Sequence, residues 1–122
     1  MNKGDIIIDG ANDFYKNAEK HAKQCKKKGI GFFDVGVSGG VWGLKNGYTL
    51  MIGGPKKDFK RIESICKDLS AKGGYGYFGE TGAGHFVKST HNIVEYVYLQ
   101  GIAEGVELLN SRKIDIKKAL SV

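Results

Sequence analysis

The strongest constraint on the fold is an alternation of continuous apolar runs with amphipathic, helix-like segments. Residues 5–9 form an apolar run between two aspartates, as in a parallel strand covered on both faces. Residues 14–28 follow as an amphipathic helix, and residues 30–37 form a second buried strand. Because short turns join these segments, the pattern predicts an α/β layer with a mainly parallel sheet.

The rest of the chain continues this alternation and ends in a long helix. We expect a third strand at residues 48–52, a helix at 56–70 and a short strand near 77–78. A long helix at 84–110 follows, and residues 111–122 begin another. Apolar residues recur at core-facing spacing in the helix at 56–70, namely Phe59, Ile62, Cys66 and Leu69.

Composition predicts an ordinary globular domain in a reducing compartment. The chain has 122 residues, 41% of them hydrophobic, which suffices for one packed core. Cys25 and Cys66 show no paired spacing and are expected to be reduced thiols. No apolar run approaches the roughly 20 residues of a membrane span, and no secretory signal is seen. We therefore expect a soluble, cytoplasmic protein without a membrane partner and without a metal site.

The formal net charge of +6 leaves the kind of partner open. The lysine runs at 26–28, 56–57 and 117–118 lie in helix-like segments, which favours solvated faces. An anionic small substrate or a nucleic-acid backbone also suits this sign. Because no arginine-rich stripe with interleaved aromatics occurs, we do not expect nucleic acid to be a partner.

The segment at residues 82–96 carries the most chemical information. It opens with a Gly-rich turn and continues as a helix whose polar residues share an arc of about 100°. These residues are Lys88, His91, Asn92 and Glu95, with Phe86, Ile93 and Val97 on the opposite side. An amine, an imidazole, an amide and a carboxylate on one helix can serve acid–base catalysis. The same pattern also fits a solvated face with charge pairs one turn apart.

Three shorter motifs bear on ligand binding. Residues 38–40, Ser-Gly-Gly, follow a buried strand, where open α/β sheets bind ligands, although an ordinary turn is the alternative. Asn12 follows the first strand and can either cap the next helix or bind a ligand. Residues 74–79 match Gly-x-Gly-x-x-Gly, but a loop is expected before them and a strand after them. We therefore interpret 74–79 as a flexible turn.

Together, residues 5–12, 38–40, 50–54 and 82–96 resemble 6-phosphogluconate dehydrogenase, the decarboxylating enzyme. The continuation Val-Trp-Gly at 41–43 is similar to the shorter, often NAD-preferring branch of that family. The resemblance implies the second half of a Rossmann-like dinucleotide-binding domain at 1–82. It also implies a connecting helix and the start of an all-helical domain at 83–122. The family's glycine fingerprint and first strands would precede Met1, so we expect a fragment that is inactive alone.

The resemblance also implies a role for each matching residue. Lys88 matches the general base that takes the C3 hydroxyl proton, and Glu95 matches the acid that protonates C1. A lysine can act as a base only when it is neutral, so the site must disfavour its charged form. The expected sugar-acid and phosphate contacts are Ser38, Gly39, Gly40, His91, Asn92 and Tyr96. Asn12 matches a residue between the substrate and the nicotinamide.

The implied function is oxidative decarboxylation of 6-phosphogluconate to ribulose 5-phosphate and CO2, in the pentose phosphate pathway and gluconate utilization. The cofactor is NAD or NADP, with most contacts outside this chain, and the full-length enzyme is expected to be a homodimer. Two departures from the family pattern are Asp13, which adds negative charge near an anionic substrate, and Ile93, where glycine is usual. The alternatives are another β-hydroxyacid dehydrogenase and a non-catalytic remnant or interaction module.

Overall fold

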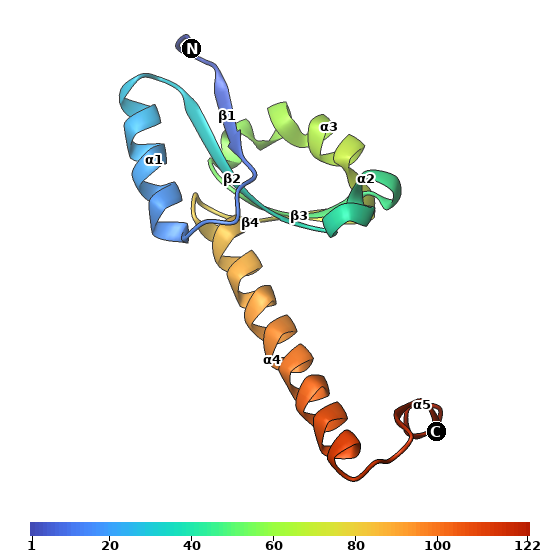
Figure 1. Ribbon diagram of the computed structural model, residues 1–122. Helices are drawn as coiled ribbons and strands as arrows, with labels where there is room; N and C mark the ends of the chain where they lie inside the picture. Colours follow the sequence, from blue (N-terminus) through green and yellow to red (C-terminus); the bar gives the residue numbers. More distant parts are fainter. The chain divides into compact units, whose positions relative to one another are not determined.

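The computed structural model describes residues 1–122, which divide into two compact units, Met1–Thr90 and His91–Val122. The strands are β1 (Ile6–Asp9), β2 (Gly31–Ser38), β3 (Tyr48–Gly53) and β4 (Ser70–Gly79) (Figure 1). The α-helices are α1 (Tyr15–Lys27), α2 (Gly43–Asn46), α3 (Phe59–Leu69), α4 (Ala83–Ser111) and α5 (Ile116–Ala119). Two 3-10 turns, η1 (Gly40–Trp42) and η2 (Lys56–Asp58), complete the chain. All four strands belong to the first unit, and α4 begins there and ends in the second.

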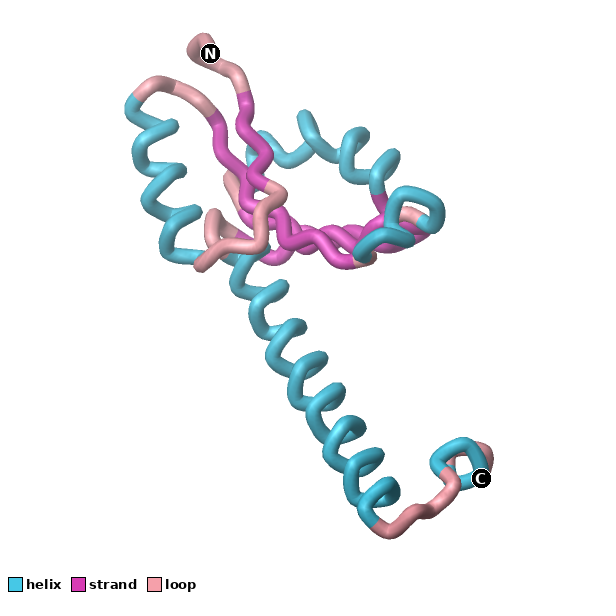
Figure 2. Tube along the Cα trace, viewed as in Figure 1, coloured by secondary structure: helices cyan, strands magenta, loops and turns pink.

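The four strands form one sheet in the order β1-β2-β3-β4. Figure 2 shows the strands in magenta. The pairs β1–β2 and β3–β4 are parallel, whereas β2–β3 is antiparallel. Residues 39–47 connect β2 to β3, and this connection is too short for a parallel crossover, which needs about a dozen residues. The prediction of a mainly parallel α/β sheet is therefore confirmed, with one reversal set by a short connection.

One face of the sheet holds the apolar core, which α3 covers. The core consists of alternate residues of β2 and β3 together with two residues of α3, namely Phe33, Val35, Leu50, Ile52, Ile62 and Cys66. The spacing prediction for α3 is confirmed at Ile62 and Cys66 but is wrong at Leu69, which is 51% exposed. Leu69 is the last residue of the helix, where the chain turns into β4. The α-helix also starts later than expected, at Phe59, because η2 precedes it.

The opposite face of β2 is covered by α1. Ala18 of α1 is fully buried, and the ring of His21 packs edge-on against Phe32 at 6.2 Å between ring centroids. Side chains of a strand alternate between faces, so Phe32, Asp34 and Gly36 lie on this side. The first strand is parallel to β2, as predicted, but its predicted burial on both faces is wrong, because Ile8 is 38% exposed.

The segment at residues 74–79 is not a flexible turn. It lies within the ten-residue strand β4, which pairs in parallel with β3. Tyr75 and Tyr77 pack against the core, and their hydroxyls donate to Glu63 Oε1 at 3.0 Å and to the Gly54 carbonyl at 2.8 Å. These contacts hold a glycine-rich sequence extended, so the expected loop and short strand near 77–78 are one long strand.

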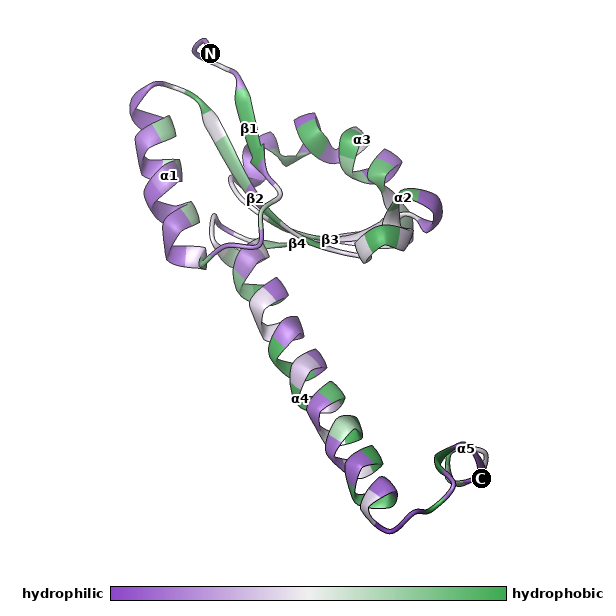
Figure 3. Ribbon diagram, in the orientation of Figure 1, coloured by the Kyte–Doolittle hydropathy of each residue, from purple (hydrophilic) through white to green (hydrophobic).

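The second unit is helical and carries many exposed apolar side chains. Figure 3 shows apolar residues, in green, along the part of α4 that belongs to this unit, residues 91–111. They include Ile93, Val94, Val97, Leu99 and Ile102, each at least 45% exposed. Neither this helix nor any other combines the length and apolarity needed to cross a membrane. The predicted helix near the end of the chain is confirmed as the short α5, Ile116–Ala119.

The two cysteines are free thiols, as predicted, and their environments differ. Burial raises the pKa of the Cys66 thiol, and the nearby Glu63 carboxylate raises it further. Cys25 is only half-buried. We predict that an aromatic disulfide reagent at pH 8 modifies Cys25 first and Cys66 at least about tenfold more slowly.

The control for this prediction is Cys25→Ser, which should leave only the slow phase. In urea both thiols of the wild-type chain should react at similar rates, because the burial is lost. A fast native reaction of Cys66 would contradict the described core.

Candidate functional site

Two predicted site residues meet at the carboxyl end of β2. Lys88 of α4 donates from Nζ to Ser38 Oγ at 3.2 Å, and both side chains are half-buried. Gly39 and Gly40 follow with φ angles of 141° and 49°, in the region that favours glycine. The turn therefore holds exposed backbone next to an amine and a hydroxyl. This arrangement can bind an oxygen-rich anionic ligand.

Asn12 lies at the same edge of the sheet. In the parallel pair β1–β2, Asp9 lies opposite Asp34, so the carboxyl ends of both strands point the same way. The alternative role of Asn12 as a helix cap is wrong. Helix α1 has Phe14 at its N-cap and no side-chain cap, and Asp13 Oδ1 accepts from Phe14 N at 2.7 Å and from Asn17 Nδ2 at 3.0 Å. Asn12 is thus exposed and available to a ligand.

Asp13 is the first of the two departures from the family pattern. The hydrogen bond from Asn17 and then that from the Phe14 amide lower the pKa of the Asp13 carboxyl. An aspartate is already ionised at neutral pH, and the lowered pKa extends its negative charge to more acidic conditions. Asp13 lies one residue after Asn12 in the sequence, so it adds a negative charge beside that predicted ligand contact.

A buried carboxylate that sequence reasoning missed joins β2 to the first turn of α4. Asp34 is fully buried and accepts from Gly82 N at 2.7 Å and from His85 N at 2.8 Å. Amide groups at a helix N-terminus lack partners within the helix, and a carboxylate satisfies them. The available signal was an aspartate inside the apolar run of β2, because a buried charge needs partners.

Glycines let α4 approach the sheet closely. A Cβ at Gly84 would clash with the carbonyl oxygens of Asp34 and Met51, and a Cβ at Gly53 would lie 2.6 Å from Asp34 Oδ1. A Cβ at Gly36 would clash with the Cβ of Lys88. The stem of Lys88 therefore passes directly over Gly36 on its way to Ser38.

His85 is the other buried polar residue on this face. It is 1% exposed, and neither ring nitrogen has a hydrogen-bond partner within the chain.

The remaining predicted residues belong to the second unit. His91 Nδ1 lies 3.6 Å from Glu95 Oε2, one helical turn away, and both side chains are about half exposed. Asn92 is half-buried and Tyr96 is 63% exposed. Within this unit the imidazole and carboxylate form a pair on one face of α4. Ile93, the second departure from the family pattern, is 64% exposed, so it does not pack in a core of this chain.

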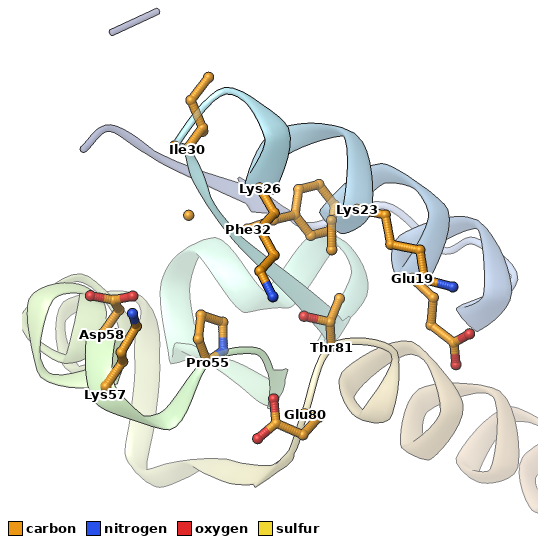
Figure 4. A pocket seen from close by; sticks show the side chains of 13 residues that line it. Glu19, Lys23, Lys26, Ile30, Phe32, Pro55, Lys57, Asp58, Glu80 and Thr81 are labelled. Carbon is orange, nitrogen blue, oxygen red and sulfur yellow. The ribbon is translucent and has the colours of Figure 1, made fainter. Parts of the chain in front are cut away.

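A cavity of about 550 Å³ lies near the start of β2, away from Ser38. Figure 4 shows lysines of α1 on one side and Pro55 and Glu80 on the other. Its charged lining consists of Lys23, Lys26, Lys57, Glu19, Asp58 and Glu80. Because these charges balance, the cavity has no evident preference for an anion, and none of the predicted site residues lines it. No cluster of three or more potential metal-binding side chains is present.

The sheet, its covering helices and the lysine at a glycine-rich strand end define a Rossmann-like domain of the dehydrogenase type. The family model for the NAD binding domain of 6-phosphogluconate dehydrogenase matches residues 1–82. The chain therefore belongs to the 6-phosphogluconate dehydrogenase family.

Relatives agree with this assignment. A decarboxylating 6-phosphogluconate dehydrogenase of Buchnera aphidicola is 42% identical over 115 residues, covering 91% of this chain and 24% of that protein. The solved 6-phosphogluconate dehydrogenase of Plasmodium falciparum, described in complexes with NADP+ and with 6-phosphogluconate, matches at 38% identity and a TM-score of 0.81. That match covers 89% of this chain and 24% of the other.

The fold extends to hydroxyacid dehydrogenases. The 3-hydroxyisobutyrate dehydrogenase of Mycobacterium tuberculosis matches at 25% identity and a TM-score of 0.81, covering 91% of this chain and 38% of that chain. Curated relatives are much longer than this chain, which spans 39% of the first and 24% of others.

The close approach of α4 to the sheet generates a prediction about stability. We expect Gly84→Ala to lower the free energy of unfolding by about 1–3 kcal/mol, because its methyl group would clash with two backbone carbonyls. The measurement is urea unfolding followed by circular dichroism.

Gly101→Ala on the same helix is the matched control. A Cβ there meets nothing within 4 Å, so this change should stabilise the helix by up to about 1 kcal/mol. Equal effects of the two substitutions would refute the described contact between α4 and the sheet.

Proposed function

We propose that this chain forms part of the substrate-binding and catalytic wall of a decarboxylating 6-phosphogluconate dehydrogenase. The observation that carries the proposal is the 3.2 Å contact between Lys88 Nζ and Ser38 Oγ at the carboxyl end of β2. It brings the residue that matches the family's general base to the Ser-Gly-Gly turn that matches its substrate contacts. The product would be ribulose 5-phosphate, which belongs to the pentose phosphate pathway and gluconate utilization.

In the proposed reaction, Lys88 and Glu95 carry protons at different carbons. Lys88 takes the proton of the C3 hydroxyl as C3 is oxidised, and returns a proton to the C3 oxygen when the C1 carboxylate leaves as CO2. Glu95 then protonates C1 of the resulting enediol. Gly39, Gly40, His91 and Asn92 bind the sugar acid, and Tyr96 its phosphate, as the family resemblance implies.

The cofactor proposed for the reaction is NAD or NADP, which accepts the hydride from C3 when bound. Asn12 is exposed at the proper edge of the sheet to contact it. The Gly-x-Gly-x-x-Gly pattern of this chain lies inside β4 and opens no helix, so it does not fit the role of a phosphate-binding turn. We therefore place only Asn12 of this chain at the cofactor.

The wider assignments are also proposals. Residues 1–82 would belong to the dinucleotide-binding domain and 83–122 to a connecting helix that begins an all-helical domain. A cytoplasmic homodimer is the proposed state of the whole enzyme. The similarity to 3-hydroxyisobutyrate dehydrogenase makes another β-hydroxyacid the second candidate substrate. The His91–Glu95 pair favours the decarboxylating reaction, because this reaction needs a separate acid for C1.

We predict that the chain binds 6-phosphogluconate in preference to 3-hydroxyisobutyrate. Titration followed by amide NMR should shift signals at residues 38–40 and at Lys88, and Lys88→Met should weaken binding about tenfold by removing a charge-assisted contact. Lys45→Met, an exposed lysine of α2, is the control. Binding of 3-hydroxyisobutyrate alone would favour the second candidate. Salt-sensitive binding of nucleic acid alone would favour a non-catalytic interaction module.

The two proton-transfer roles predict different losses of activity. The test places this chain in the corresponding segment of the Plasmodium falciparum enzyme and follows reduced cofactor together with deuterium incorporation at C1 of the product. Lys88→Met should lower oxidation by about 10²–10⁴-fold. Glu95→Gln should spare oxidation and slow C1 protonation. An equal loss of both steps in Glu95→Gln would contradict the assigned roles.

A further inference from the structure

The position of the Lys88 amine depends on more than its own contact with Ser38. Lysine has a long, flexible side chain, so one 3.2 Å hydrogen bond at its tip does not fix its backbone. The backbone of Lys88 is set by where α4 begins, because Lys88 lies three residues after His85, about 4.5 Å along the helix axis. The contacts of the first turn of α4 therefore matter for the amine.

That first turn is held by one carboxylate on β2. Asp34 is fully buried and uses both oxygens, Oδ1 toward Gly82 N and Oδ2 toward His85 N. Two hydrogen bonds from one short side chain fix both the position of the helix start along β2 and its rotation about the helix axis. A hydrogen bond to a charged acceptor is about twice as strong as a neutral one.

Every second residue of β2 between Asp34 and the candidate site faces α4. Asp34, Gly36 and Ser38 lie on one face of β2, because strand side chains alternate. Asp34 holds the start of α4, Gly36 lies directly beneath the stem of Lys88, and Ser38 accepts from its amine. These three residues thus contact one helix at three successive points.

We propose that Asp34 is a positioning residue that places the Lys88 amine on Ser38 by fixing the first turn of α4, with Gly36 providing the space for the lysine stem. The effect of this placement on substrate binding rests on the proposed function, whereas the placement of the amine does not. Loss of the carboxylate leaves α4 free to shift along β2. A displacement of about 1 Å at a catalytic group can lower a rate about 10²-fold.

The placement is tested without substrate. The variant is Asp34→Asn, which keeps the size of the side chain and one acceptor oxygen, and asparagine is itself a good N-cap. In NMR spectra, the Cε–Hε signals of Lys88 (assigned by their loss in Lys88→Met) should move to the values seen in Ser38→Ala. Hydrogen exchange should rise at least about tenfold at the amide, of Gly82 or His85, that loses its acceptor oxygen. Unchanged Lys88 signals would overturn the proposal.

A second variant changes the contact between Gly36 and the stem of Lys88. Gly36→Ala should also displace the Lys88 signals, because an added Cβ would clash with the Cβ of Lys88 and lie 2.8 Å from the Gly84 carbonyl oxygen. The matched control is Asp115→Asn, because Asp115 caps α5 by accepting from Lys118 N at 3.2 Å. This exposed cap should leave the Lys88 signals unchanged. If Asp115→Asn moves them as much as Asp34→Asn does, the proposal is overturned.

A double-mutant cycle tests whether Asp34 affects binding through Lys88. Dissociation constants for 6-phosphogluconate are measured for the wild-type chain, Asp34→Asn, Lys88→Met and the double variant. Asp34→Asn should weaken binding at least about fivefold when residue 88 is lysine. It should weaken binding by less than about twofold in the Lys88→Met background. Equal weakening in both backgrounds would show a merely structural role and overturn the proposal. Absence of binding by the wild-type chain would count against the proposed function, while the substrate-free spectra still decide the placement.

Discussion

The first unit depends on the carboxylate of Asp34, which joins its second strand to its long helix. A buried carboxylate without partners is strongly unfavourable, and so are buried amide groups at a helix N-terminus. Each group satisfies the other here, because Asp34 accepts from Gly82 N and His85 N. This explains why a charged residue occurs between Phe33 and Val35 in an apolar strand. Alternation keeps it on the face opposite the core, so the packing under α3 is undisturbed.

Strand β2 therefore serves stability on one face and the candidate site on the other. Phe33 and Val35 belong to the apolar core, while Asp34, Gly36 and Ser38 contact α4. A change on either face alters the position of the same backbone.

Local patterns were sufficient for part of this fold. The apolar run of β1 and the amphipathic period of α1 predicted both elements, because strand and helix periodicity are local properties. Only the part of β4 near residues 77–78 was predicted, because the glycines of this segment disfavour a strand although its tyrosines favour one. Its extended state depends on pairing with β3 and on the packing of Tyr75 and Tyr77, which only the folded chain provides. Of the two roles left open for Asn12, the helix cap does not form, since α1 begins after Phe14 without a side-chain cap.

The candidate site likewise has residues that the sequence predicted and one that depends on contacts between distant segments. Ser38 and Lys88 were found because a strand end and a helix face are visible in the sequence, and the family resemblance connects them. Asp34 was missed because its partners, the amides of Gly82 and His85, lie far from it in the sequence. The separations are 48 and 51 positions. Its presence in an apolar run was nevertheless a signal, because a buried carboxylate must find several donors. Backbone amides at a helix start are the donors that a Rossmann-like domain can bring to the middle of a strand. In this chain the aspartate in the buried strand marks the docked N-terminus of α4, and the start of the helix sets the positions of its later residues, Lys88 among them.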